Sequence, residues 1–245
     1  MKKIIGVLVT ILVITMIIIL SLTFIKKTST PFFVFESRTE NTKKELEKNP
    51  STVGWVKVQG TDIDYPIVKD ANYLNTPTEI IDRIWLSKYY EKSANRMVIY
   101  GHNYLNVGRK PLITNKTHKR FEQLMSFVYY SFAKDNLYIQ YSYDDEDEIY
   151  KIYAISFYDY DEDIGQSYYD KKEITEYINT AKKKSIYDYD VDVNGDDKII
   201  TLMTCTRYFG DTSKQQFRID ARKLRKKEKI EKYSVKKSEN YDIMN

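Results

Sequence analysis

The chain starts with a long uncharged segment and continues with short segments in which apolar and polar residues alternate. Residues 4–25 carry no charged side chain and follow the lysines at positions 2 and 3. Roughly 22 residues in a helix span about 33 Å, enough to cross a bilayer whose hydrocarbon core is about 30 Å thick. The segment is too long for the apolar part of a cleaved signal peptide. We therefore predict a transmembrane signal-anchor over residues 4–25.

After the anchor, the pattern becomes that of β structure. Residues 26–50 are charged and are predicted to form a linker and an N-terminal helix. Strand-like runs, rich in β-branched and aromatic residues, then recur along the chain. They make about eight strands, at residues 54–58, 63–68, 84–86, 97–100, 137–141, 149–157, 199–204 and 217–224. The acidic residues 144–148 are predicted to be a solvated hairpin tip rather than a calcium site.

Two helices are predicted within this β-rich region. They cover residues 121–132 and 171–185, where apolar side chains recur three or four positions apart. Beyond residue 224 the chain is basic and has no apolar period, so residues 225–245 are predicted to form a disordered tail. The sequence thus predicts a mostly β domain at residues 51–224, with flanking helices.

The amino-acid composition excludes several classes of function for this protein. The 245 residues, 42% hydrophobic and 30% charged, are enough for one domain with its own core. The net charge of +4 gives no strong field for nucleic acid. One cysteine excludes an intramolecular disulfide, and one cysteine with two histidines argues against a zinc site.

The candidate catalytic residues lie where predicted strands end. Cys205, the single cysteine, follows the strand at residues 199–204. A thiol at a strand end can project into a cleft and act as a nucleophile, but a buried structural cysteine is the alternative. His102 follows the strand at residues 97–100 and is preceded by a glycine that permits a tight turn. His118 lies in a polar, charged stretch and is predicted to be solvated, which makes His102 the better partner for Cys205.

Two arginines compete for a third role. Arg218 begins an alternating apolar and charged segment, and on this pattern alone it could lie on the solvent face of an edge strand. A fixed guanidinium can instead donate two hydrogen bonds to a developing oxyanion. Arg207 lies closer to Cys205 in the sequence, and spacing alone does not decide between the two arginines.

Together these segments resemble the sortases, the cysteine transpeptidases of Gram-positive surfaces, and most closely class B. The resemblance covers residues 32–224 in the family's order. Met203 stands where class B often has serine. The matching segments are the T-L-x-T-C signature, the histidine motif Y-G-H-N, the early Gly-Trp strand and the I-D-Y-P-I-V strand, at residues 201–205, 100–103, 54–55 and 63–68.

The resemblance implies a sortase-type eight-stranded β-barrel with flanking helices, preceded by one N-terminal transmembrane helix. It implies that Cys205 is the nucleophile, that His102 transfers protons and that Arg218, rather than Arg207, holds the oxyanion. It further implies that Thr204 lines the substrate cleft. The enzyme would cleave a C-terminal sorting signal after threonine through a thioester, and would need no metal or organic cofactor.

The resemblance also implies partners and a location. The partners would be surface or pilin proteins with a C-terminal sorting signal, and the amine acceptor a peptidoglycan precursor or a pilin lysine. The protein would cross the cell membrane once, with residues 1–3 as a cytoplasmic stub, an extracellular catalytic domain and no nucleic-acid partner. A class B-type pilin polymerase and a membrane-bound cysteine peptidase would use the same residues and stay open. A binding module in which Cys205 is buried is the alternative from another class.

Overall fold

The computed structural model describes residues 12–16, 32–69, 83–113, 120–162, 165–168, 170–212 and 214–243. The chain divides into two units, residues 1–34 and 35–245, and the fold given below is that of the second. In the first unit, residues 12–16 are helical. Within the described ranges, no helix has the length and apolar character needed to span a membrane. Most of the predicted anchor at residues 4–25 lies outside those ranges and stays a prediction.

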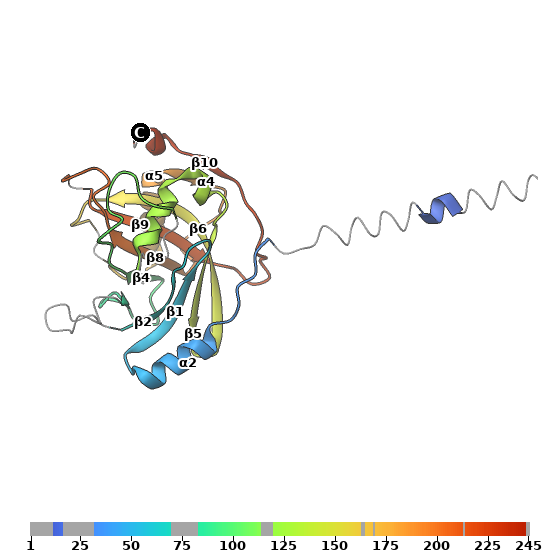
Figure 1. Cartoon of the computed structure of the whole chain (residues 1–245), viewed down its shortest axis with the longest axis horizontal. Coiled ribbons are helices and arrows are strands. Elements are labelled where there is room, and N and C mark those ends of the chain that lie inside the picture. Colours follow the sequence, from blue (N-terminus) through green and yellow to red (C-terminus); the bar gives the residue numbers. More distant parts are fainter. Residues whose placement is uncertain are drawn as a thin grey trace, which may run out of the picture. The chain divides into compact units, whose positions relative to one another are not determined.

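Eight strands close into a barrel (Figure 1). In spatial order the strands are β1 (Thr52–Val58), β2 (Asp64–Val68), β3 (Ile84–Leu86), β4 (Arg96–Tyr100), β8 (Ile199–Cys205), β9 (Gln216–Lys223), β6 (Glu146–Tyr158) and β5 (Tyr138–Tyr143). Strand pairing is parallel between β2 and β3 and between β4 and β8, and antiparallel elsewhere in the barrel. The predicted eight-stranded barrel is therefore confirmed, with strand boundaries that differ by a few residues.

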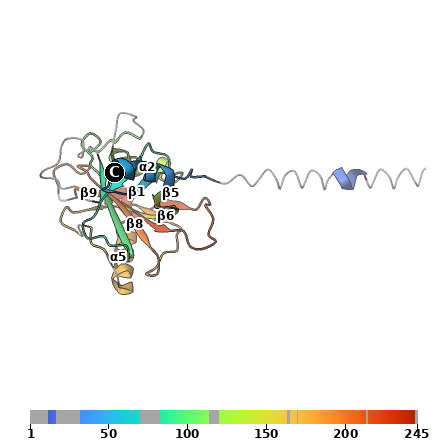
Figure 2. The same cartoon turned by 90° about the horizontal axis from the view of Figure 1, so that it is seen from below.

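The sequence pattern explains which strands are covered. Buried and half-buried residues alternate along β1, as expected where one face lies on the core and the other near solvent. β8 and β9 are buried on both faces almost throughout. The helix α5 (Lys171–Lys184) packs against the outside of the barrel, chiefly beside β6 (Figure 2). Its Tyr177 donates a 2.6 Å hydrogen bond to Asp220 of β9.

The two predicted helices have different outcomes. The helix α5 agrees with the prediction, and it begins after Asp170, whose carboxylate accepts from the backbone N–H groups of the first turn. The segment predicted as one helix over residues 121–132 is instead a 3₁₀ helix, η1 (Glu122–Val128), and a short helix, α4 (Tyr130–Ala133). The break falls at Tyr129, which has an extended backbone.

The reason for the break is that η1 is buried on every side, so tertiary contacts rather than one apolar stripe set its conformation. Even its polar residues are used. The Gln123 side chain accepts from the backbone N–H of Asp62 at 2.6 Å, and the Glu122 side chain accepts from the backbone N–H of Tyr104 at 3.3 Å.

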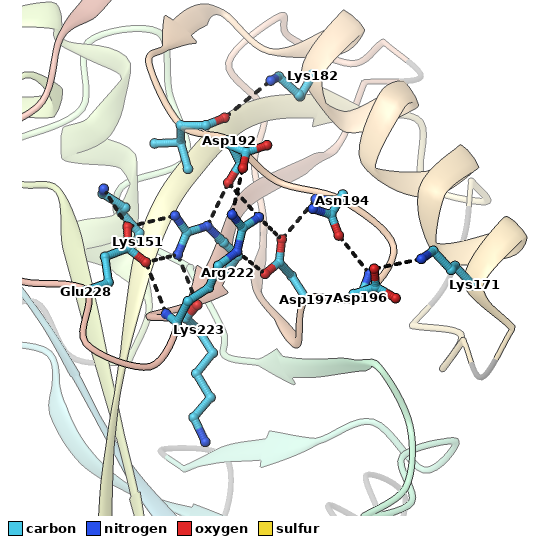
Figure 3. Close-up of polar contacts among 12 residues, drawn as sticks. Lys151, Lys171, Lys182, Asp192, Asn194, Asp196, Asp197, Arg222, Lys223 and Glu228 are labelled. Atoms are coloured by element: carbon cyan, nitrogen blue, oxygen red, sulfur yellow. Dashed lines mark hydrogen bonds and ion pairs between the residues drawn. The ribbon is translucent and has the colours of Figure 1, made fainter.

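Residues 225–243 differ from the predicted disordered tail, because they are ordered against the barrel. The strand β10 (Val235–Lys237) pairs with β7 (Tyr187–Tyr189), and the short helix α6 (Glu239–Ile243) follows. Figure 3 shows how ion pairs hold the start of this segment: Glu228 binds Arg222 of β9 and Lys151 of β6, with distances of 2.8 and 2.9 Å. These contacts, chiefly that with Arg222, lower the pKa of Glu228 to about 2. The basic run looked solvated in the sequence because Lys151, one partner of Glu228, lies 77 positions earlier in the chain.

Candidate active site

Cys205 is the last residue of β8, and its side chain is exposed. The β-forming residues before it carry the strand to the end of the barrel where β4 and β6 also end and where β9 begins. The surrounding protein displaces enough water from the thiol to raise the pKa of Cys205, and the positive charge of Arg207 opposes that rise. The single thiol is therefore accessible and mainly protonated in the resting protein.

The segment after β4 stays attached to the end of β8. The backbone N–H of Gly101 donates to the carbonyl of Met203 at 3.1 Å, and the Thr204 hydroxyl donates to the carbonyl of Gly101 at 2.7 Å. A Cβ at residue 101 would lie 2.5 Å from the ring of Phe121, so the packing here requires glycine. His102 follows directly and is thus held at the same end of the barrel as Cys205.

The imidazole of His102 lies close to two aromatic rings. Its centroid is 5.1 Å from that of Trp85, at 52°, and 5.0 Å from that of Tyr104, at 24°. Half-burial lowers the pKa of His102, because desolvation disfavours the imidazolium. The neutral form of the ring is therefore favoured.

Asn103 links the histidine turn to the cysteine, a role that the sequence analysis did not assign. Its side-chain N–H₂ donates to the carbonyl of Cys205 at 3.0 Å and to the carbonyl of Asn106 at 3.2 Å. Its side-chain oxygen accepts from the N–H of Asn106 at 3.0 Å. The residue is 4% exposed. The position of Asn103 directly after the candidate histidine was the one sequence feature that pointed to this role. Its hydrogen-bond partner, the carbonyl of Cys205, could not be inferred from the sequence spacing.

Arg218 lies on β9 and is completely buried. It is the cross-strand partner of Met203, two positions from the pair formed by Cys205 and Gln216, so the four side chains share one face of the sheet. Its guanidinium lies 3.8 Å from the centre of the Tyr158 ring. Because β9 pairs with both β8 and β6, the interpretation of this segment as an edge strand is wrong.

The remaining candidate residues fall in different places. Arg207 is exposed in the loop after β8. Thr204 is 3% exposed and lies on the opposite face of β8 from Cys205, with its hydroxyl bonded to Gly101. His118 lies outside the described residues. Within the described part of the chain, no group of three or more His, Cys, Asp or Glu side chains could hold a metal ion.

Comparison with known proteins shows which proteins this arrangement is similar to. No family model matches the chain. It is 27% identical over 185 residues to sortase B of Staphylococcus aureus, with 70% of each chain covered. It is 28% identical over 177 residues to sortase B of Listeria monocytogenes, with 66% of each covered. These likenesses support a cysteine enzyme of the sortase transpeptidase family.

Solved structures agree with the likeness in sequence. Sortase B of Clostridium perfringens superposes with a TM-score of 0.62 at 23% identity, over 75% of this chain and 100% of that one. A Staphylococcus aureus sortase B–substrate complex superposes with a TM-score of 0.61 at 20% identity, over 76% and 86%. The fold is therefore the sortase fold, and the resemblance to class B sortases is confirmed.

Proposed function

We propose that this protein is a membrane-anchored class B-type sortase, which cleaves a C-terminal sorting signal after threonine and transfers the surface protein to an amine. One observation carries the proposal. The only thiol of the chain is exposed at the end of β8, and the turn that bears His102 is hydrogen-bonded to the same strand end. A sortase B of similar fold has been solved in complex with its substrate, which supports a sortase substrate for this protein.

The mechanism follows from the three side chains. The Cys205 thiolate attacks the carbonyl carbon of the threonine, and Arg218 stabilises the oxyanion that forms. His102 protonates the departing amine, which leaves a thioester on Cys205. An incoming amine then attacks the thioester, and His102 accepts its proton. Thr204 does not line the cleft in this mechanism. Its hydroxyl donates to the carbonyl of Gly101 and so stabilises the turn before His102.

The opposing pKa shifts set the resting state of the pair. The pKa of Cys205 is raised and the pKa of His102 is lowered, so a neutral thiol and a neutral imidazole predominate. Acylation needs a thiolate and an imidazolium, which form a minor share of the protein at neutral pH. The rate therefore depends on both groups and follows a bell-shaped pH profile.

The experiment that tests the proposal compares acceptors. The full-length protein in detergent is incubated with a library of fluorogenic peptides that carry threonine at the cleavage position. Each peptide is tested with one of three acceptor conditions: triglycine, a lysine-bearing peptide, or no added amine. We expect cleavage after threonine and a ligated product that displaces the hydrolysis product. A preference for triglycine favours wall anchoring, and a preference for the lysine peptide favours pilin polymerisation. Hydrolysis alone at saturating amine would contradict the transferase and leave a cysteine peptidase.

A further inference from the structure

Gln216 lies beside both the candidate nucleophile and the candidate oxyanion donor. It is the first residue of β9 and the cross-strand partner of Cys205. Side chains of such partners lie on the same face of a sheet, with Cβ atoms about 4.5–5.5 Å apart. Arg218 follows two residues later on the same strand and therefore on the same face. Gln216 is only 4% exposed, so its amide must find partners within the protein.

Both ends of the Gln216 amide are bonded. Its Oε1 accepts from two donors of Arg218, Nε at 3.0 Å and Nη2 at 2.6 Å. Its Nε2 donates a short hydrogen bond to the backbone carbonyl of Tyr160, in the loop after β6. One neutral side chain thus fixes one edge of the guanidinium and ties it to a loop.

Further contacts hold the guanidinium of Arg218 from other sides, and together with Gln216 they form a frame around it. Its guanidinium lies over the ring of Tyr158, and its Nη2 also makes a short hydrogen bond to the carbonyl of Glu162. The Glu162 carboxylate is in turn held by Lys184 at the end of α5, with both oxygens at 2.7 Å from Nζ. Arginine has several rotatable bonds, so a guanidinium acts as a preorganised donor only where such a frame fixes its plane.

We propose that Gln216 is a positioning residue, which aims the guanidinium of Arg218 at the oxyanion formed on Cys205. The inference rests on the proposed function, because it takes Arg218 as the oxyanion donor. Gln216 acts through Arg218 and does not itself touch the reacting atoms. Its effect should therefore appear in the acylation rate constant and vanish when Arg218 can no longer be aimed.

The test is a double-mutant cycle in the full-length protein. Gln216→Leu removes the acceptor at nearly constant volume, Arg218→Lys removes the planar donor, and a third variant carries both changes. Gln215→Leu is the matched control, because Gln215 is the preceding residue and its amide donates to the carbonyl of Thr212, at 2.9 Å, rather than contacting Arg218 in the described residues. If Gln216→Leu does not fold, Gln216→Glu takes its place, because it keeps the acceptor for Arg218 and loses the donor to Tyr160.

Three quantities are measured on each variant: the single-turnover acylation rate with one threonine peptide, the alkylation rate of Cys205 by iodoacetamide, and the thermal midpoint. Loss of a hydrogen bond to a charged group corresponds to about 10- to 100-fold in rate. We expect Gln216→Leu to slow acylation by that amount, with unchanged alkylation, and Gln215→Leu to match the parent. In the Arg218→Lys background, Gln216→Leu should cost little more. Where Gln216→Glu is used, acylation should stay within a few-fold of the parent.

The outcomes separate the two claims. If Arg218→Lys is severely impaired while Gln216→Leu acylates at the parent rate, the positioning role fails and the proposed function stands. Fully additive losses in the double variant also overturn the positioning role, because they show that Gln216 acts independently of Arg218. If Gln216→Glu is the variant used, acylation as slow as that of Arg218→Lys overturns the role. If Arg218→Lys acylates normally, both Gln216 and the oxyanion role of Arg218 are overturned.

Discussion

The side-chain amide of Asn103 donates a hydrogen bond to the backbone carbonyl of Cys205, with a distance of 3.0 Å between nitrogen and oxygen. The bond joins the residue after the candidate base to the candidate nucleophile. The same amide oxygen accepts from the backbone of Asn106, so the loop after β4 is fixed as well. The relative position of His102 and Cys205 therefore depends on a side chain that takes no part in the chemistry.

Asn103→Ala should lower both stability and acylation. Removal of a partner from a buried hydrogen bond costs about 1–3 kcal/mol in the free energy of unfolding. Because the lost bond positions the site, acylation should fall even at temperatures where the variant is fully folded. Asn136→Ala is the control, since Asn136 also donates to a backbone carbonyl, that of Phe132 at 2.9 Å. Equal acylation by the two folded variants would show that Asn103 is only a stabilising residue.

The two histidines should differ sharply in their effects. His102→Ala removes the group that protonates the leaving amine, and proton transfer by a positioned side chain contributes roughly 10²–10⁴-fold to a rate. His118→Ala should stay within a few-fold of the parent. Steady-state cleavage of one threonine peptide measures both. A reversed order would mean that the match of residues 100–103 to the histidine motif is coincidental.

The two arginines provide a similar contrast. Arg218→Lys keeps the charge but loses the planar fork, and loss of one oxyanion donor typically costs roughly 10²–10³ in rate. Arg207 is exposed in a loop, so Arg207→Lys should be nearly silent. Single-turnover acylation with the same peptide is the measurement. A larger defect at Arg207 would overturn the assignment of the oxyanion donor.

The reactivity of Cys205 should increase with pH over an unusually alkaline range. Only the thiolate is alkylated, and partial desolvation by the surrounding protein raises the pKa of Cys205, so the midpoint of the iodoacetamide rate should lie above that of a free cysteine. The charge of Arg207 favours the thiolate, and Arg207→Gln should therefore move the midpoint further upward. A midpoint below that of free cysteine would instead indicate a preformed thiolate–imidazolium pair.

Much of the barrel could be predicted from the sequence because strand formation is encoded locally. The β-branched residues of β8 favour a strand, and Cys205 and His102 lie where β8 and β4 end. The helix α5 was equally clear, because its apolar residues recur with helical spacing. In these segments local preference and tertiary packing agree.

The features that were not predicted depend on partners remote in the chain. The segment η1 carries a helical pattern, but contacts with Asp62 and Tyr104 hold it as a tighter helix. Residues 225–243 look like a solvated tail until Glu228 is placed beside Lys151, which lies 77 positions earlier in the chain. The alternation around Arg218 is equally compatible with an edge strand, and pairing on both sides is what buries it.

The acyl-enzyme itself is the most direct test of the account. The full-length protein and Cys205→Ala are each mixed with a threonine-containing sorting peptide, and their intact masses are recorded before and after hydroxylamine. We expect the parent protein to gain the mass of the peptide fragment that ends in threonine and to lose that mass after hydroxylamine. The alanine variant should gain no mass. Because the chain has a single cysteine, peptide turnover or the same mass gain in Cys205→Ala would contradict the mechanism.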